Sequence, residues 1–169
     1  HLPLHERLYV SETDPQLFAL LKTNILGHFG EDPRITVGAV NLTLPLTEDL
    51  ISQKFDTVVS FNVLEHIDDD AAALANLVEL LDRGGAGGKL RIVSLVPAHQ
   101  WAYGSMDREY GHFRRYSKRS FSELARRVAP DWNYSARYFN VVGLPGWVVM
   151  GRILRKSRID PLAVEAFDK

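Results

Sequence analysis

Short apolar segments rich in β-branched residues alternate along this chain with longer segments whose apolar residues recur every three or four positions. The short segments predict β-strands at residues 8–11, 34–40, 55–61 and 89–96, and residues 55–61 read as the clearest buried strand. The longer segments predict amphipathic helices with apolar stripes at Leu17, Leu21 and Ile25, at Leu74, Leu77, Val78 and Leu81, and at Phe121, Leu124 and Val128. Strands that alternate with helices indicate the α/β class, and we expect a doubly wound, mostly parallel sheet.

Capping residues bound each predicted helix. A side chain that accepts from the first free amides begins a helix, and glycine commonly ends one. Proline is tolerated in the first helical turn because its missing amide would be unpaired there. These signals are Asp14-Pro15 and then Gly27 or Gly30 for the first helix, residues 68–70 and 84–85 for the second, and a capping box of Ser120 and Glu123 at the start of the third.

Residues 134–139 predict a further strand, and an apolar helix follows from Trp147 to Leu154. With its flanks this helix forms a segment, residues 143–158, that ends in basic residues. Aromatic and basic residues beside an apolar stripe are typical of a helix in a membrane interface. A chain of this size, however, needs its apolar surface for its own core. We therefore expect the helix to pack mainly against this protein and to make at most a weak membrane contact through its basic end; an interfacial membrane helix is the alternative.

Composition narrows the class of protein. The 169 residues are 46% hydrophobic, which suffices for one domain with a buried core. Because 20 Lys and Arg nearly balance 21 Asp and Glu, the net charge of -1 argues against a nucleic-acid partner. The absence of cysteine excludes disulfides, thiol catalysis and cysteine-ligated metals. No apolar run reaches the roughly 20 residues of a membrane span, and residues 1–7 lack the apolar core of a signal peptide, so we expect a cytoplasmic protein.

Residues 55–70 (FDTVVSFNVLEHIDDD) carry the most specific pattern in the chain. This segment resembles a strand and the turn after it in class I S-adenosylmethionine-dependent methyltransferases. Residues 80–85 (LLDRGG) resemble the turn before the next strand of that family, with Arg83 where proline is usual. The resemblance covers Tyr9 to about Tyr138. It implies one methyltransferase domain over residues 1–169, a Rossmann-like sheet, S-adenosylmethionine as cofactor and methyl transfer as the reaction.

Residues 103–116 (YGSMDREYGHFRRY) resemble a loop of a bacterial methyltransferase subgroup that is sometimes fused to glycosyltransferases. Since they follow a predicted strand, we expect residues 98–117 to lie where substrate enters. The substrate-binding candidates in this loop are Tyr103, Asp107, Arg114 and Arg115, of which the two arginines suit a carboxylate or phosphate of the acceptor. The alternative is structural: the arginines pair with Asp107 or Glu109, and Tyr116 packs against the next helix.

Glu12 follows the first predicted strand, where an acidic side chain suits the hydroxyls of a ribose. A solvated loop carboxylate is the alternative. The resemblance assigns Glu12 to the ribose of the cofactor. It assigns Asn41 to the adenine amino group, although aspartate is usual there, because an amide carbonyl accepts the same hydrogen bond. It places Asn62 and Val63 beside the methionine and sulfonium end.

A hydroxyl acceptor must lose a proton, and His112 is the first candidate base because an unperturbed imidazole titrates near neutrality. His66 and Tyr116 are the reserves. Some quinone-related methyltransferases bind magnesium with a trio that resembles the segment around Glu65 and His66. Because Asn62 stands here at the first carboxylate of such a trio, we expect no metal and a hydrogen-bonded, structural His66.

The family pattern also includes a glycine-rich loop after its first strand, and no such segment precedes Leu8. We therefore expect an incomplete methyltransferase domain that lacks its first, central strand; truncation, disorder and a partner strand are all open as reasons. The acceptor is expected to be a small or lipid-linked molecule. Two other functions are open: a non-catalytic, degenerate methyltransferase that acts as a binding or membrane-adaptor module, and a dinucleotide-dependent oxidoreductase, which Glu12 alone would allow.

Overall fold

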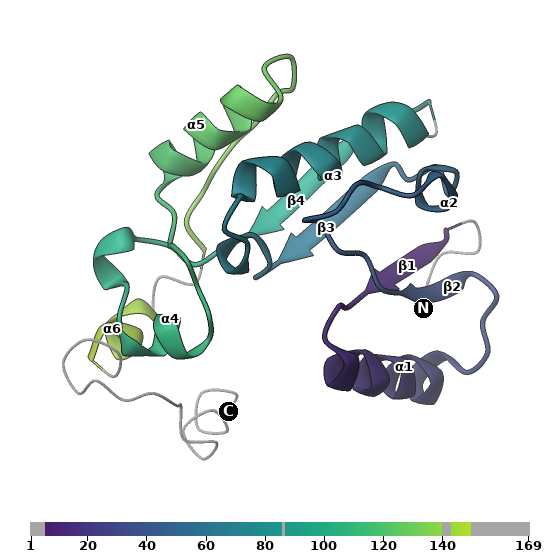
Figure 1. Ribbon diagram of the computed structural model, residues 1–169, viewed down its shortest axis with the longest axis horizontal. Coiled ribbons are helices and arrows are strands. Elements are labelled where there is room, and N and C mark those ends of the chain that lie inside the picture. The colour runs from purple at the N-terminus through teal and green to yellow at the C-terminus, as the bar shows by residue number, and fades with distance from the viewer. Residues whose placement is uncertain (1–5, 86, 140–142, 150–169) are drawn as a thin grey trace. The chain divides into compact units, whose positions relative to one another are not determined.

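The computed structural model describes residues 6–85, 87–139 and 143–149 (Figure 1). The chain divides into two units, residues 1–44 and residues 45–169. Helices alternate with parallel strands in both units, so the predicted α/β class is confirmed, and the arrangement is consistent with part of the Rossmann-like sheet that the resemblance implies. No helix within the described ranges is long and apolar enough to cross a membrane.

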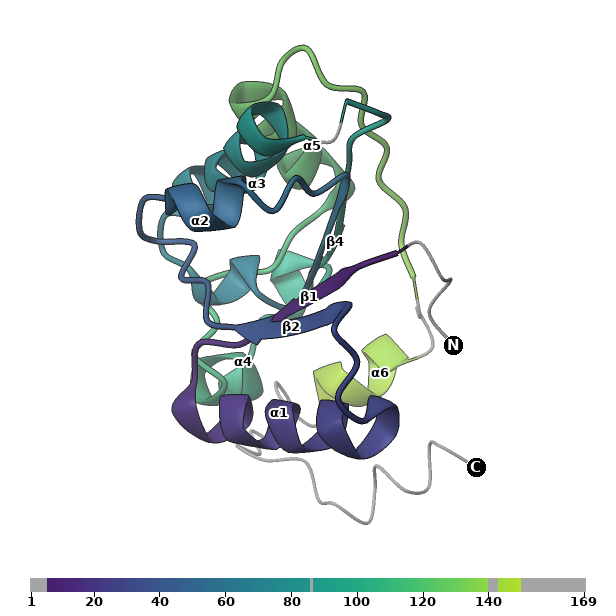
Figure 2. The same cartoon turned by 90° about the vertical axis from the view of Figure 1, so that its right-hand side faces the viewer.

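The first unit is a β–α–β element. β1 (Leu8–Ser11) and β2 (Ile35–Gly38) form a parallel pair along their whole length. The helix α1 (Pro15–Phe29) connects the two strands and runs alongside the pair in both views (Figure 1 and Figure 2). All three elements were predicted from the sequence pattern.

The sequence signals that bound α1 act as predicted. Asp14 accepts hydrogen bonds from the amides of Gln16 and Leu17, both at 2.9 Å. Gly30 ends the helix with a φ of 65°, which favours glycine. The apolar stripe, however, is not buried: α1 has no buried residue, and Leu17 is 53% exposed. Two strands of four residues offer too small a surface to cover a helix of 15 residues.

The second unit contains the parallel pair β3 (Thr57–Phe61) and β4 (Arg91–Leu95). The helix α3 (Asp70–Gly84) connects these strands and packs on them. Two further helices pack on α3: α5 (Lys118–Val128) and the short α2 (Glu48–Ile51), which the sequence analysis missed. The core of this unit consists of apolar side chains from these helices, namely Leu50, Ile51, Ala73, Leu74, Leu77, Leu80, Leu81 and Leu124.

One face of the β3–β4 pair carries exposed apolar side chains. Val59 and Phe61 are 55% and 59% exposed, and their cross-strand neighbours Val93 and Leu95 are 48% and 39% exposed. The prediction of a strand at residues 55–61 is confirmed, but the prediction that it is buried is wrong. Successive side chains of a strand point to opposite faces, and α3 covers only one of them.

The predicted strand at residues 134–139 does not form. This segment has no ladder partner among the described residues, and Phe139 is 77% exposed. β-branched and aromatic residues favour a strand only where a neighbouring strand offers a surface to pack on.

The start of α5 also differs from the prediction. Its N-cap is Ser117, whose hydroxyl accepts from the amide of Ser120 at 3.0 Å. Glu123 pairs with Arg119 at 2.8 Å and does not complete a capping box with Ser120. Because the earlier serine satisfies the free amides, the helix begins three residues sooner.

The last described helix, α6 (Gly143–Val148), begins before the predicted start at residue 147. The remainder of the predicted apolar helix and its basic end, residues 150–158, lies outside the described residues.

Among the described residues the strands form two separate parallel pairs, β1–β2 and β3–β4.

Candidate active site

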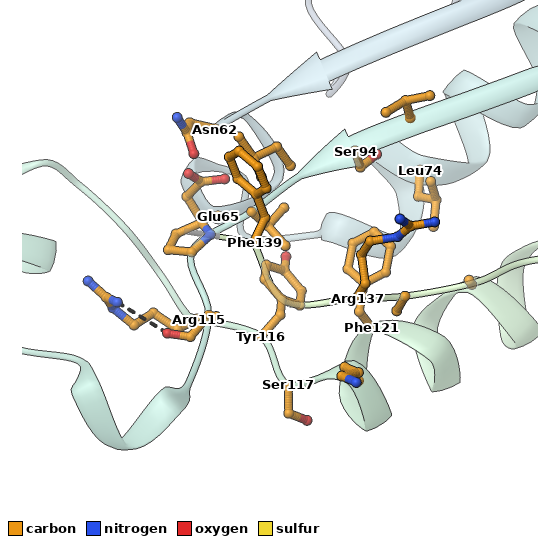
Figure 3. A pocket seen from close by; sticks show the side chains of 18 of the residues that line it. Asn62, Glu65, Leu74, Ser94, Arg115, Tyr116, Ser117, Phe121, Arg137 and Phe139 are labelled. Atoms are coloured by element: carbon orange, nitrogen blue, oxygen red, sulfur yellow. Dashed lines mark hydrogen bonds between the residues drawn. The ribbon is translucent and has the colours of Figure 1, made fainter. Parts of the chain in front are cut away.

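The candidate site begins at the carboxyl end of β3, the edge at which open α/β sheets bind ligands. Asn62 follows the strand with a φ of 50°, a conformation that asparagine adopts more readily than most residues. The chain then forms a short 3-10 helix, η1 (Leu64–His66), which Val63 precedes. The side chains of Asn62 and Glu65 lie near each other at an open cavity of about 1060 Å³ (Figure 3).

Glu65 is fully buried, and neither carboxylate oxygen has a hydrogen-bond partner in the described part of the chain. Burial raises the pKa of this carboxyl to about 7. The backbone carbonyl of Glu65, in contrast, accepts a hydrogen bond from the amide of Phe113 at 2.7 Å. The backbone of Glu65 therefore links η1 to the loop of residues 98–117. Its side chain is a buried carboxyl group without a hydrogen-bond partner among the described residues.

Two imidazole rings meet beside Glu65. The ring centroids of His66 and His112 are 4.6 Å apart, and the ring planes are nearly perpendicular at 84°. The side chain of His112 is only 9% exposed, and it lines the same cavity as Asn62. Burial lowers the pKa of His66, and the neighbouring His112 lowers it further.

Asp107 orients His112. Its Oδ1 lies 2.9 Å from Nδ1 of His112, which leaves Nε2 of that ring for another partner. Burial by itself would raise the pKa of Asp107, but hydrogen bonds from Arg115 and His112 hold it below its ordinary value. The fully buried carboxylate accepts four hydrogen bonds: from His112, from Nε of Arg115 at 2.7 Å, from the amide of Gly104 at 2.8 Å and from Nε1 of Trp147 at 3.3 Å.

The loop that supplies these residues is more ordered than the sequence suggests. It contains the 3-10 helix η2 (Gln100–Ala102) and the short helix α4 (Ser105–Glu109). A parallel bridge between Ala98 and Tyr116 closes its two ends. The hydroxyl of Tyr103 donates to the carbonyl of His112 at 2.7 Å, so this tyrosine supports the backbone of the candidate base.

Arg114 and Tyr116 both contact Asp70, the first residue of α3. A guanidinium nitrogen of Arg114 lies 3.2 Å from the Asp70 carboxylate, and the hydroxyl of Tyr116 donates to it at 2.8 Å. Tyr116 is 5% exposed and packs edge-on against Phe121. Burial, with the Asp70 carboxylate, raises the pKa of the Tyr116 phenol, which opposes its use as a base near neutral pH. These contacts match the structural alternative for Tyr116, whereas Arg114 pairs with Asp70 and not with Asp107 or Glu109.

In the first unit, Glu12 and Asn41 follow the paired ends of β1 and β2. Oε1 of Glu12 accepts from the amides of Thr13 and Asp14 at 2.7 Å and 2.9 Å. Oδ1 of Asn41 accepts from the amide and the hydroxyl of Thr43 at 2.9 Å and 2.8 Å. Both side chains therefore shape the turn that they begin.

Sequence reasoning missed two contributors to this site. Glu65 stands inside the most specific motif, but only burial distinguishes it from an ordinary helix-start carboxylate. Trp147 was expected on a helix that packs mainly against this protein, but it was not assigned to the site; its indole contacts Asp107, and its ring centroid lies 4.7 Å from the guanidinium carbon of Arg115. No signal in the sequence could place Trp147 beside Arg115.

Residues 4–86 match the model of a family described as a methyltransferase domain. This match supports a class I methyltransferase-like domain in this stretch of the chain, in agreement with the resemblance of residues 55–70. The matched range contains Glu65 and His66, whereas the loop that carries His112 lies beyond it. A search among curated proteins found no match.

Proposed function

We propose that this protein transfers a methyl group from S-adenosylmethionine to a small or lipid-linked acceptor. The family match over residues 4–86 is the observation that carries the proposal. The positions of Glu12 after β1 and of Asn62 and Val63 after β3 support it, because parallel α/β sheets bind ligands at the carboxyl ends of their strands.

The first unit fits the cofactor in part. Two backbone amides fix Oε1 of Glu12, and Oε2 retains the capacity to accept from a ribose hydroxyl. Asn41 fits less well with the adenine amino group, because the two bonds from Thr43 fill the lone pairs of its Oδ1. Its Nδ2 is a donor, which suits a ring nitrogen of adenine instead.

S-adenosylmethionine, when bound, supplies an electrophilic methyl group on a sulfonium. The protein's part is to hold the acceptor in line and to exclude water. Nε2 of His112 takes the proton of the acceptor hydroxyl, and the carboxylate of Asp107 stabilises the resulting imidazolium through Nδ1. The lowered pKa of His66 keeps that neighbouring ring neutral, so it does not repel the imidazolium.

The cavity favours an acceptor with an apolar body and one hydroxyl end. Aromatic side chains form part of its wall, among them Phe121, Trp132 and Tyr138. Arg114 and Arg115 are committed to Asp70 and Asp107, so their contacts support a structural role better than a clamp on the acceptor. Recognition therefore depends mainly on the shape of the apolar wall.

Calorimetric titration with S-adenosylhomocysteine tests the proposal. We expect saturable binding by the protein and a loss of roughly 1.5–3 kcal/mol of binding free energy in Glu12→Ala, the range for hydrogen bonds to charged groups. Glu31→Ala is the matched control, since Glu31 is an exposed carboxylate of the same unit. It should bind like the unaltered protein.

Absence of binding by a folded protein would refute the proposal and favour a non-catalytic module. Equal affinity of Glu12→Ala and the unaltered protein would refute the ribose assignment while leaving methyl transfer standing.

A further inference from the structure

Three potential metal ligands meet at the end of β3. A carboxylate oxygen of Glu65 and one ring nitrogen each of His66 and His112 all lie within 4.8 Å of one another. Glu65 and His66 come from η1, whereas His112 comes from the loop after α4. The fold thus brings together donor atoms that are far apart in the chain.

The carboxylate of this cluster lacks a partner. Glu65 is fully buried, yet both of its oxygens are without a hydrogen bond in the described structure. Buried carboxylates are normally paired, hydrogen-bonded or bound to a metal. The guanidinium of Arg115 does not fill this role, since it binds the Asp107 carboxylate and the carbonyl of Ala98.

Neighbouring protein groups contact the rings of both histidines, as is usual for histidines that bind metals. Asp107 engages Nδ1 of His112, so Nε2 is the nitrogen left for coordination. Backbone groups of Tyr110 and Gly111 interact with the ring of His66 and act against the lowering of its pKa by burial. Histidines that bind metals usually donate their second ring nitrogen to a carboxylate or a backbone carbonyl, as His112 does to Asp107.

We propose that Glu65, His66 and His112 bind a divalent transition-metal cation, with zinc as the best match. Two imidazoles and one carboxylate are a known zinc-binding set that leaves a coordination position open. This proposal replaces the expectation of no metal, which considered Asn62 and not His112 as the third member.

Such a cation would deepen the proposed function. It would act as a Lewis acid that lowers the pKa of the acceptor hydroxyl, so that this hydroxyl releases its proton to water in the open cavity, and Nε2 of His112 would then be a ligand and not the proton acceptor. This role rests on the proposed methyl transfer, whereas binding of the cation does not.

The test is calorimetric titration of the chelator-stripped, untagged protein with zinc chloride. We expect one equivalent to bind with a micromolar or lower Kd. Glu65→Gln and His112→Ala should each weaken binding about tenfold or more, since even the groups that only orient metal ligands contribute on this scale. His99→Ala is the matched control, because His99 lines the same cavity outside the cluster, and its affinity should be unchanged.

The visible absorption spectrum of the cobalt-loaded protein tests the metal site without any amino-acid substitution. Cobalt bound by the unaltered protein should show the strong visible absorption of a four- or five-coordinate site. The weak spectrum of the hydrated ion, a lack of saturable zinc binding, or full affinity in folded Glu65→Gln would overturn the proposal.

Titration of the same stripped protein with S-adenosylhomocysteine separates the two proposals. Binding of S-adenosylhomocysteine without zinc binding refutes the metal site alone. Zinc binding without S-adenosylhomocysteine binding supports the metal site and refutes methyl transfer.

Discussion

The carboxylate of Asp107 accepts hydrogen bonds from three side chains and one backbone amide, and these donors lie before α4, after α4 and on α6. Arg115, one of the donors, is itself buried and forms its ion pair with this carboxylate at 2.7 Å. A single side chain therefore joins the loop, the helix α6 and the candidate base. It also offsets a buried positive charge.

We expect Asp107→Ala to lower the free energy of unfolding by about 3–5 kcal/mol, because it leaves the Arg115 guanidinium buried without a countercharge. Urea denaturation followed by circular dichroism measures this change. Glu109→Ala, an exposed carboxylate of the same helix, should stay within about 0.5 kcal/mol of the unaltered protein. A loss below about 1 kcal/mol in Asp107→Ala would show that Arg115 finds another partner.

In its proposed role as general base without a bound metal, His112 should contribute the usual factor of a positioned base, so His112→Ala should lower turnover by about 10²- to 10⁴-fold. Affinity for S-adenosylhomocysteine should change much less, because the residues assigned to the cofactor are Glu12, Asn62 and Val63. Transfer of tritium from methyl-labelled S-adenosylmethionine into lipid and small-molecule extracts measures turnover, with His28→Ala, an exposed histidine, as the control. Equal losses of affinity and turnover would place His112 in cofactor binding.

At the scale of elements, the turn into β2 contains a local ion pair. The carboxylate of Asp32 binds the guanidinium of Arg34 at 2.6 Å and also accepts from the Arg34 amide at 2.9 Å. These bonds lower the pKa of Asp32 to about 2. A lowered pKa in the folded state means that the pair stabilises this unit above about pH 4 and that its contribution is lost as the pH falls toward 2.

Arg34→Gln should therefore move the pKa of Asp32 up toward the ordinary value of 3.8. Titration of the side-chain carboxyl by carbon NMR measures it. Lys22→Gln removes an exposed positive charge from α1 and should leave the pKa of Asp32 at about 2. A pKa near 3.8 in the unaltered protein would mean that the pair is not formed in solution.

For the molecule as a whole, the described part of α6 bears on the question of a membrane contact. Trp147 donates to Asp107 and stacks under Arg115, so its indole packs on this protein. We expect no salt-resistant co-sedimentation with vesicles that contain an anionic phospholipid, and no change in Trp147→Ala. Binding that survives high salt and disappears in Trp147→Ala would instead identify an interfacial helix.

The amino-acid sequence by itself determined the type and order of most elements and indicated a methyltransferase-like domain, which the family match supports. Strand and helix signals at β1, α1, β2 and α3 are local, since period, caps and glycines act over a few residues. The motif at residues 55–70 is contiguous as well, so it could be recognised without any knowledge of packing. Local signals gave a wrong prediction where strand formation or burial depends on packing against another element. Examples are the unformed strand at residues 134–139 and the exposed face of β3.

Only the tertiary structure decided which polar residues meet and which of them are buried. His112 and Arg114 stand close together in one loop, yet His112 contacts Asp107 and Arg114 contacts Asp70. Glu65 reads in the sequence as a polar residue at a helix start, and packing makes it an unpaired acid beside two imidazoles. The physical reason is that burial and long-range contact depend on how whole elements pack, which no short stretch of sequence encodes.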